Sequence, residues 1–349
     1  MSAAGDPTAS RTAAAPSVSA VAGQRILVTG GNGFLGCHAA VAARQSGADV
    51  LVVDLPGTTV WAERIRASLG GKGVAAREVS QLDAQALRDL LTGFCPQVVL
   101  HLAGVTRRDA TPEALAQCAA GNVDVTVAVL AAMTDLPDGL RPALVMPGSQ
   151  MEYGLAPMPW TERQAGMPAN PYGASKLAAT ELVLTAVRTR QARACVARLA
   201  LVFGPAQAPT MIVPELIIKA LRGMAFRMTS GEQRRRFVRA ADVARCLLEL
   251  GGRLAAGKHV PPLVNALACE PIRVVDLAQR LAACIGDKVV LQVGALPQRG
   301  GELPEAWPDT ALAESLGLPA VAPLDEALAA TVAWYRANPW FTESFEPPP

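Results

Sequence analysis

The segment Arg25–Gly36, RILVTGGNGFLG, constrains the fold of this chain more than any other. Its apolar start predicts a buried strand, and Gly30, Gly33 and Gly36 follow. A strand that leads through glycines into a helix binds the pyrophosphate of a dinucleotide, because backbone N–H groups and the helix dipole face the anion. We expect Gly30 to permit the turn, Gly33 to let backbone approach the pyrophosphate, and Gly36 to let the helix pack on the strand. The helix opens at Phe34–Leu35.

A second apolar run, Val50–Val53, indicates which dinucleotide is bound. This run ends in Asp54, eighteen residues after Gly36. A carboxylate at this place accepts hydrogen bonds from the adenosine ribose and repels a 2′-phosphate. We therefore expect NAD as the cofactor and NADP as the less favoured one.

Strand-like and helical segments alternate from Arg25 to Val202, which predicts an α/β fold with a doubly wound parallel sheet. Beyond Phe203 the alternation loosens, so we expect a smaller C-terminal lobe over the carboxyl edge of the sheet, where such folds bind ligands. The expected division is a disordered tail (residues 1–23), a dinucleotide-binding domain (24–204 and about 237–265), and a substrate-binding lobe (205–236 and about 266–340).

Composition narrows the class of partner. The 349 residues carry a net charge of +2 and only 18% of them are charged, so nothing favours nucleic acid or an anionic membrane surface. The seven cysteines are dispersed and form no CxxC pair, which is typical of reduced thiols, and with three histidines no metal site is expected. No segment is predicted to span a membrane, and the N-terminus does not fit a signal peptide. We expect a cytoplasmic protein that acts on a small molecule.

Tyr172 and Lys176 form the candidate catalytic pair. Four residues apart on a helix, they lie on one face. A tyrosine is a poor base at neutral pH, but a neighbouring ammonium and a nicotinamide cation favour its phenolate. Lys176 could also hold the nicotinamide ribose, and Ser149, at the end of the preceding strand, could hydrogen-bond the same substrate oxygen.

Several motifs in a fixed order identify a family. The chain resembles the extended short-chain dehydrogenases/reductases, in particular the NAD-dependent nucleotide-sugar epimerase/dehydratase group, over about Arg25–Asn338. The motifs are the TGxxGxxG turn (Thr29–Gly36), Asp54, HLAG (His101–Gly104), Asn122, SxxxYG (Ser149–Gly154), YxxxK (Tyr172–Lys176), FGP (Phe203–Pro205), and Phe237-Val238 before Ala241–Ala244.

The resemblance implies a set of site residues and a homodimer. Its cofactor contacts fall on Gly30, Gly33, Phe34, Leu35, Gly36, Asp54, Ser80, Gln81, Leu102, Ala103, Gly104, Asn122, Tyr172 and Lys176. Ser80 stands where the family has an adenine-contacting aspartate.

In addition to Ser149, the resemblance implies that two arginines bind the substrate. Gln233–Val238 resembles the family segment QxRDFV, whose arginine meets a pyrophosphate and matches Arg235. Arg299–Asp309 resembles a later family segment and offers Arg299. Two guanidiniums suit a diphosphate through bidentate hydrogen bonds. The alternative is that this basic segment is a solvated loop.

Departures from the family pattern bear on the reaction. Leu201 replaces an asparagine that helps to hold the diphosphate in many members. Gln150 and Met151 replace the Asp-Glu pair of the dehydratases, and neither can protonate a leaving hydroxyl, so a 4,6-dehydratase is not expected. Glu152 is near but out of register. His38 and His101 are interpreted as core residues.

The expected function is NAD-dependent oxidoreduction of a nucleotide-sugar hydroxyl. Tyr172 would take the proton while hydride passes to the nicotinamide, giving a transient ketone at C4, and return of hydride to the other face would make the enzyme a 4-epimerase. One alternative is a 4-ketoreductase of deoxysugar assembly. A second is a dehydrogenase of a smaller sugar acid or polyol, which Leu201 would permit. A third is a non-catalytic NAD-binding protein, which the intact Ser149, Tyr172 and Lys176 argue against.

Overall fold

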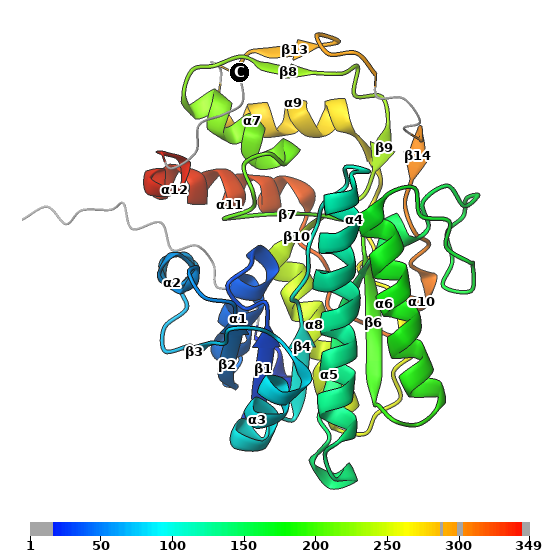
Figure 1. Cartoon of the computed structure of the whole chain (residues 1–349). Helices are drawn as coiled ribbons and strands as arrows, with labels where there is room; N and C mark the ends of the chain where they lie inside the picture. Colours follow the sequence, from blue (N-terminus) through cyan, green and yellow to red (C-terminus); the bar gives the residue numbers. More distant parts are fainter. Residues whose placement is uncertain (1–16, 287–288, 299–302, 344–349) are drawn as a thin grey trace, which may run out of the picture.

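A seven-stranded sheet forms the centre of the computed structural model, which describes residues 17–286, 289–298 and 303–343. The strand order is β11-β6-β5-β4-β1-β2-β3 and every pairing is parallel (Figure 1). The predicted doubly wound parallel sheet is therefore confirmed. The strands are β1 (Arg25–Thr29), β2 (Asp49–Asp54), β3 (Ala75–Glu78), β4 (Val98–His101), β5 (Ala143–Ser149), β6 (Ala194–Leu199) and β11 (Leu263–Asn265).

Helices cover both faces of this sheet. Because side chains alternate across a strand, β1 sends Ile26 and Val28 into one core and Leu27 into the other. The sequence predicts that Asp83 caps a helix beginning at Ala84, and its carboxylate indeed accepts a hydrogen bond from Ala86 N (2.8 Å). The helices of this unit are α1 (Phe34–Gln45), α2 (Thr59–Ser68), α3 (Ala84–Phe94), α4 (Pro112–Cys118), α5 (Val125–Thr134), α6 (Pro171–Arg188) and α8 (Ala240–Ala255).

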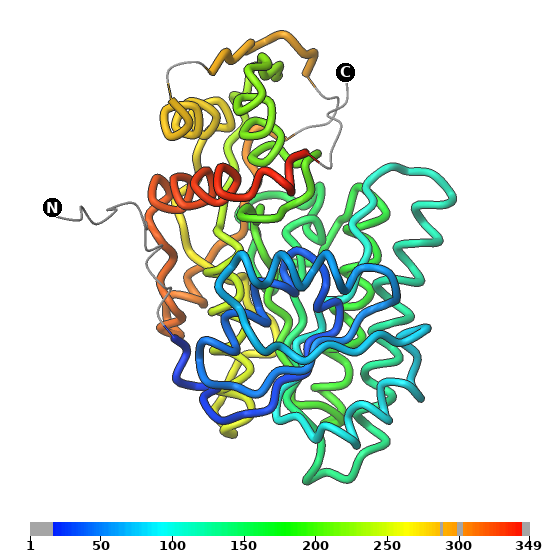
Figure 2. The backbone as a smooth tube through the Cα atoms, turned by 90° about the vertical axis from the view of Figure 1, so that its left-hand side faces the viewer, coloured from blue at the N-terminus to red at the C-terminus, as the bar shows by residue number. Residues whose placement is uncertain are grey.

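A smaller unit with its own core lies beyond the carboxyl ends of the strands, and Figure 2 shows that α11 is its helix nearest the sheet. Leu216, Leu277 and Leu328, from three of its helices, are fully buried there. We propose that this unit is the expected substrate-binding lobe. Its elements are α7 (Ile212–Leu221), β8 (Phe226–Met228), β9 (Arg234–Arg235), β12 (Ile272–Arg273), α9 (Val274–Ile285), β13 (Leu291–Val293), β14 (Glu305–Ala306), α11 (Leu324–Ala337) and α12 (Pro339–Glu343). The short helix α10 (Ala311–Ser315) lies below this unit in Figure 1.

The chain leaves the sheet at Ala200, inside an apolar run that predicted one strand over 194–202. β6 ends at Leu199, and β7 (Leu201–Phe203) pairs instead with β10 (Phe237–Arg239) in a separate parallel pair. The prediction of one strand is wrong here, because the apolar residues on both sides of Ala200 conceal the change of pairing partner. β7 leads the chain from the sheet into the smaller unit, and β10 leads it back to α8.

The described part of the predicted tail is folded. Residues Ser19–Val21 form one helical turn, and Val18 and Val21 are buried in the core beside α8. A Cβ on Gly252 of α8 would lie 2.5 Å from the carbonyl oxygen of Ala20, so the contact is close. The prediction of disorder is wrong for residues 18–23, and residues 1–16 lie outside the described part.

The expectation that no segment approaches a membrane span also needs correction. The helical segment Pro112–Thr134 has 23 residues and a mean hydropathy of 1.5 in its most apolar part, which is long and apolar enough by composition alone. It comprises α4, a π-helical stretch and α5. In the structure α5 packs on α3 and α6, as a covering helix of the sheet does.

Candidate functional site

The glycine turn has the geometry that its sequence predicts. Gly30 adopts φ +66°, and a Cβ there would lie 2.4 Å from Ala103 N, so only glycine fits. A Cβ on Gly36 would lie 2.1 Å from Gly30 O, which brings α1 directly onto the turn. The N-cap Gly33 supplies no side-chain hydrogen bond to α1. The N–H groups of its first turn are thus available to an anion, which fits the pyrophosphate of NAD.

Asp54 lies beside this turn at the end of β2. Its carboxylate accepts hydrogen bonds from Asn32 N and Leu55 N, both at 2.9 Å. It thereby fixes the turn and keeps further lone pairs for ribose hydroxyls. Ser80 and Gln81 follow β3, the neighbouring strand, and are exposed at the same edge. These positions suit contacts with adenosine, and the contacts themselves stay predictions.

Arg66 is a residue of this region that sequence reasoning missed. It lies on α2, is 2% exposed, and donates to Asn32 Oδ1 (3.0 Å) and Gly31 O (3.3 Å). Its buried Nη2 has no hydrogen-bond partner among the described residues. Arg66 thus holds α2 against the glycine turn beside Asp54. No sequence motif marks this arginine, and its position in an amphipathic helix is the only sequence signal for its structural role.

Asn122 connects the end of β4 to the helix that carries Tyr172. Its Nδ2 donates to Val105 O (2.9 Å) and Ser175 Oγ (2.8 Å), and its Oδ1 accepts from Val105 N (2.9 Å). A Cβ on Gly104 would lie 2.7 Å from that Oδ1. Because the amide is engaged on both atoms, we expect Asn122 to position Ser175 and Gly104 rather than to contact the cofactor. Leu102 and Ala103 precede Gly104 and border the glycine turn.

Ser149, Tyr172 and Lys176 come together as predicted. Ser149 ends β5, and its hydroxyl, which accepts a hydrogen bond from Met151 N (3.1 Å), lies near enough to Tyr172 to lower the pKa of that side chain. Tyr172 and Lys176 lie on α6, which begins at Pro171 after Asn170 caps Gly173 N (2.9 Å). Ser175 Oγ donates to Tyr172 O (2.9 Å), so the Asn122 contact reaches the same turn of helix.

Burial dominates the electrostatics of this trio. Burial raises the pKa of Tyr172, while the hydrogen bond with Ser149 lowers it and the charge of Glu152 raises it further. Burial also lowers the pKa of the Lys176 ammonium, and the Glu152 carboxylate opposes that change. A phenolate here therefore needs further stabilisation, which a positively charged nicotinamide would supply if NAD were bound beside Tyr172.

Glu152 forms a buried ion pair beneath Ser149. It is 0% exposed, its Oε1 accepts from Ser149 N (2.7 Å), and its Oε2 accepts from Arg198 Nε (2.8 Å). The Arg198 guanidinium lies over the ring of Tyr153, 4.5 Å from its centroid. The interpretation of Glu152 as out of register for acid catalysis fits this arrangement, since both of its oxygens bind protein groups.

The two histidines near the site are buried and neutral. His101 lies between Thr29 Oγ1 (2.8 Å) and Thr126 Oγ1 (3.1 Å), and burial lowers its pKa to about 3. His38 contacts Pro205 O (2.9 Å), and burial lowers its pKa to about 4. Both geometries agree with the predicted core roles.

The basic segment near position 235 is not a solvated loop. Arg235 is 9% exposed on β9, and its guanidinium donates to Arg234 O (2.7 Å) and Leu303 O (2.8 Å). Arg234 donates to Pro271 O (3.2 Å), and Arg236 to Pro308 O (2.9 Å). Arg235 and Arg236 thus hold the chain on either side of β14, and Arg234 holds the residue before β12. Arg299 lies outside the described residues.

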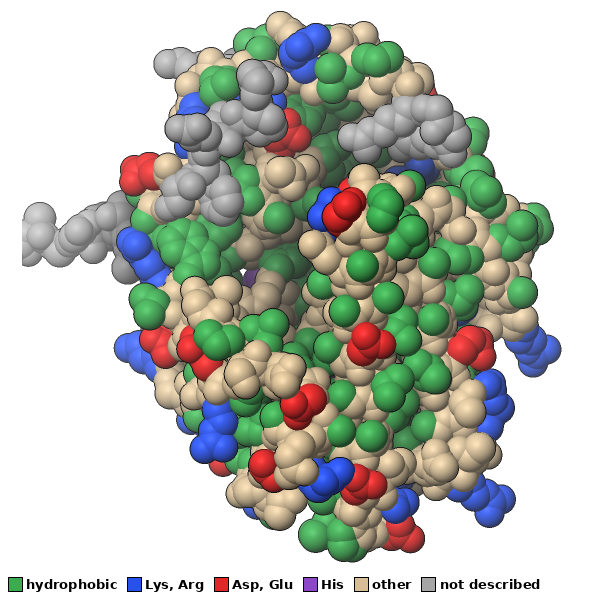
Figure 3. All heavy atoms as spheres, viewed as in Figure 1, with side chains coloured by type: hydrophobic (Ala, Val, Ile, Leu, Met, Phe, Trp, Pro, Cys, Tyr) green, Lys and Arg blue, Asp and Glu red, His purple; other side chains and the backbone are tan. Residues whose placement is uncertain are grey.

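The predicted cofactor and catalytic residues gather at the carboxyl edge of β1, β2, β4 and β5. Figure 3 shows the surface hollowed beside α4, with a histidine at the bottom of the hollow. A positioned tyrosine, serine and lysine next to a dinucleotide turn can move a proton to or from a hydroxyl while hydride is transferred.

Comparisons with known proteins agree with this geometry. Residues 26–263 match the model of the NAD dependent epimerase/dehydratase family. The UDP-glucose 4-epimerase of Erwinia amylovora is 25% identical over 344 residues, covering 90% of this chain and 98% of that protein. The dTDP-D-glucose 4,6-dehydratase of Mus musculus is 24% identical over 326 residues, covering 90% of this chain and 89% of that protein.

A solved structure extends the likeness to three dimensions. A UDP-glucose-4-epimerase from Stenotrophomonas maltophila, with bound NAD and formylated UDP-arabinopyranose, aligns with a TM-score of 0.79. The alignment covers 91% of this chain and 99% of that one, at 22% sequence identity. At this identity the likeness shows the shared fold.

Proposed function

Because this chain belongs to the NAD dependent epimerase/dehydratase family, within the extended short-chain dehydrogenases/reductases, we propose that it epimerises a nucleotide sugar at C4. It is an NAD-dependent enzyme of this class. The observation that carries the proposal is the placement of Ser149 at the end of β5 near Tyr172, with Lys176 one turn from Tyr172 on α6 and the glycine turn at the end of β1.

In the proposed reaction Tyr172 removes the proton from the C4 hydroxyl. Ser149 holds the same oxygen, and Lys176 holds the nicotinamide ribose and stabilises the phenolate. Gly30, Gly33 and the first turn of α1 would hold NAD, which would accept the hydride from C4 and return it when bound. After the ketosugar has rotated in the site, so that its other face receives the hydride, Tyr172 returns the proton. Gln150 and Met151 supply no acid or base for loss of water, which favours epimerisation over dehydration.

A sugar labelled with deuterium at C4 tests this reaction. Purified enzyme with NAD is incubated with UDP-[4-²H]glucose or UDP-[4-²H]-N-acetylglucosamine, and the products are separated and examined by NMR. An epimerase gives the C4 epimer with deuterium retained at C4 and no net change in NADH absorbance. Accumulation of NADH indicates a dehydrogenase instead, and conversion of only a 4-keto sugar with consumption of NADH indicates a ketoreductase. Tyr172→Phe is the matched inactive control.

We further propose that the smaller unit binds the nucleotide diphosphate. The support is Arg235, together with the family likeness of the segment that contains Arg299. Calorimetric titration of UDP, dTDP, GDP and CDP into the NAD-loaded enzyme checks this directly. Binding of one of them is expected, and binding of none would favour a smaller sugar acid or polyol as substrate.

We also propose that the enzyme is a homodimer formed through the outer face of α4 and α5. Leu115 and Val127 are 55% and 47% exposed there, and only 33% of the most apolar part of the helical segment is buried. Figure 3 shows hydrophobic side chains scattered over this face. Sedimentation velocity should give a dimer that Val127→Glu converts to monomer, and a monomeric parent enzyme would refute this.

A further inference from the structure

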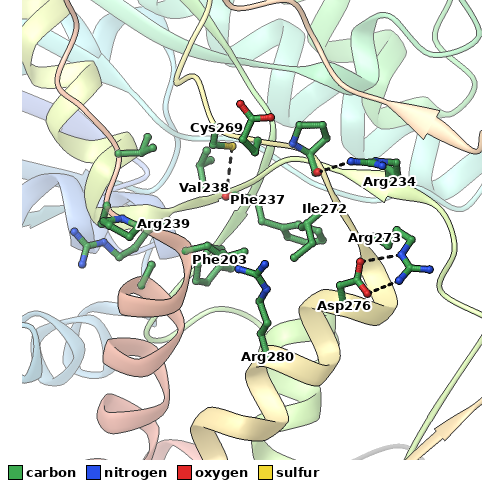
Figure 4. Close-up of a pocket in the computed structure, with 17 residues that line it drawn as sticks. Phe203, Arg234, Phe237, Val238, Arg239, Cys269, Ile272, Arg273, Asp276 and Arg280 are labelled. Carbon is green, nitrogen blue, oxygen red and sulfur yellow. Dashed lines mark hydrogen bonds and ion pairs between the residues drawn. The ribbon is translucent and has the colours of Figure 1, made fainter.

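Several arginines of this protein show how a guanidinium charge is usually balanced in it. Figure 4 shows a cavity of about 510 Å³ between β10, α9 and the start of α11, with arginines in its wall. Three of them pair with carboxylates: Arg239 with Asp242 (3.0 Å), Arg273 with Asp276 (2.7 Å) and Arg280 with Asp325 (3.4 Å). The buried Arg198 and Arg245 pair in the same way with Glu152 and Asp242.

Arg66, behind the glycine turn, forms no ion pair with any residue that the structure describes. It lies on α2, is 2% exposed, and donates from Nη1 to Asn32 Oδ1 (3.0 Å) and Gly31 O (3.3 Å), which are both neutral acceptors. Its buried Nη2 has no hydrogen-bond partner in the described part of the chain. A buried charge without a direct counter-ion is costly, so a guanidinium kept in this state points to a role beyond packing.

Asp54 lies on the other side of the peptide unit that Arg66 contacts. This unit joins Gly31 to Asn32, and its carbonyl accepts from Arg66 while its N–H donates to Asp54 Oδ2 (2.9 Å). Cys37, whose Sγ lies 3.7 Å from Gly31 O, senses both charges. Burial raises the pKa of its thiol to about 11, while the charge of Arg66 lowers this pKa and that of Asp54 raises it. The cation and the anion are therefore separated by one peptide unit, where the adenosine ribose is expected.

The charges at this edge of the sheet sum to −1. Glu78 is the register partner of Asp54 and accepts a hydrogen bond from Gly57 N (3.4 Å), so two carboxylates stand against Arg66. The other charged side chains of these elements are Arg77, which alternation along β3 places on the opposite face from Glu78, and the exposed Glu63 and Arg64 of α2, whose charges are opposite. A net negative edge fits the expected preference for NAD, and Arg66 limits how negative that edge is.

We propose that Arg66 sets how strictly this enzyme prefers NAD to NADP. The two cofactors differ by a 2′-phosphate on the ribose that Asp54 is expected to face. Asp54 and Glu78 repel this phosphate, whereas Arg66 attracts it from the interior, where charges interact more strongly than in water. Because its guanidinium is buried, Arg66 is a positioning residue that acts by its charge and through the Gly31–Asn32 peptide. The proposal rests on NAD binding and not on the epimerisation proposed above.

Calorimetric titration of NAD and NADP into the Asp54→Ala enzyme, which keeps Arg66, tests the proposal. Removal of Asp54 leaves Glu78 and Arg66, whose charges sum to zero, so net repulsion of the 2′-phosphate ends. NAD loses its ribose hydrogen bonds with Asp54 in the same variant. We therefore expect NADP to bind this variant at least as tightly as NAD, although the parent prefers NAD. If NADP still binds Asp54→Ala more weakly than NAD does, the proposal is wrong.

Substitutions of Arg66 in the Asp54→Ala background assign the effect to its charge. Arg66→Gln should raise the ratio of the NADP to the NAD dissociation constant about tenfold, because Glu78 is then unopposed. Arg66→Lys keeps the charge and should keep the ratio. A purely structural role would weaken both cofactors alike and leave the ratio unchanged, which would refute the proposal.

Arg64→Gln in the same background is the matched control. Arg64 lies on the exposed side of the same helix, with its guanidinium 4.0 Å from the ring centroid of Trp340, so its loss should not change the ratio. A rise as large as that of Arg66→Gln would overturn the assignment. Unfolding midpoints identify any variant that does not fold, in which case the Asp54→Ala titration decides alone. These readouts need no sugar turnover, so their failure is distinct from failure of the proposed epimerase.

Discussion

Replacing Glu152 by glutamine tests the buried ion pair beneath Ser149. The carboxylate uses one oxygen for Ser149 N and the other for Arg198 Nε, whereas an amide has only one oxygen. One of these two buried donors must then face an NH₂ group, and Arg198, 2% exposed, loses its counter-charge. Removing one partner of a buried pair costs about 3–5 kcal/mol, so we expect a loss of that size in the free energy of unfolding.

Urea denaturation measures this loss as a lower midpoint at unchanged slope. The matched control is Glu181→Gln, which removes an ion pair with Arg188 whose side chains are 57% and 61% exposed. That pair should contribute about 0–1 kcal/mol. If Glu152→Gln costs no more than Glu181→Gln, the buried pair does not support β5 and the reasoning fails.

Four further predictions concern the site and its surroundings. Tyr172→Phe should keep the fold and NAD affinity while turnover falls roughly 10²-fold or more; near-normal turnover would remove Tyr172 from the mechanism. Asp54→Ala should narrow the preference for NAD over NADP in fluorescence titrations, and tighter NADP binding by the parent enzyme would contradict the ribose assignment. Arg235→Ala should weaken nucleotide-sugar binding by about 1.5–3 kcal/mol in calorimetry and also lower the unfolding midpoint, since its guanidinium binds backbone carbonyls; an unchanged midpoint would refute the structural role. Because burial holds the pKa of His38 near 4 and of His101 near 3, against 6.5 unfolded, the unfolded chain binds more protons below pH 6.5. The free energy of unfolding should then fall by about 2 kcal/mol per histidine between pH 7.5 and 5. His38→Gln should lose less stability than the parent over this range, and an equal loss in the two proteins would contradict the reasoning.

The sequence predicts those parts of the fold and site whose causes are local. Gly30 and Gly36 are where a Cβ would collide with the neighbouring backbone, so the motif and the geometry have one cause. Tyr172 and Lys176 share a helix, and helical spacing alone brings them to one face. The Asp83 cap likewise acts within three residues.

Features that depend on a distant partner could not be predicted in this way. Arg235 lies in a run of charges that is typical of solvent-exposed loops, yet carbonyls of residues 68 and 69 positions away surround it. The pair of Glu152 with Arg198 joins positions 46 apart. The turn at Ala200 leaves no local signal, because both possible partners of the strand accept an apolar sequence. In each case the decisive group lies elsewhere in the chain.

The strand order has a consequence for the making of the chain. β11, the last strand of the sheet, and α8, which covers one face, are translated only after α7, β8 and β9 of the smaller unit. While the first 200 residues leave the ribosome, β6 therefore keeps an open edge and part of the apolar face beside α1 stays uncovered. The turn Ser19–Val21 must wait for α8 as well, since it docks there. The nascent chain therefore exposes apolar surface that can misassociate until about residue 265 has emerged. The N-terminal turn then docks on α8 at the stage when β11 completes the sheet.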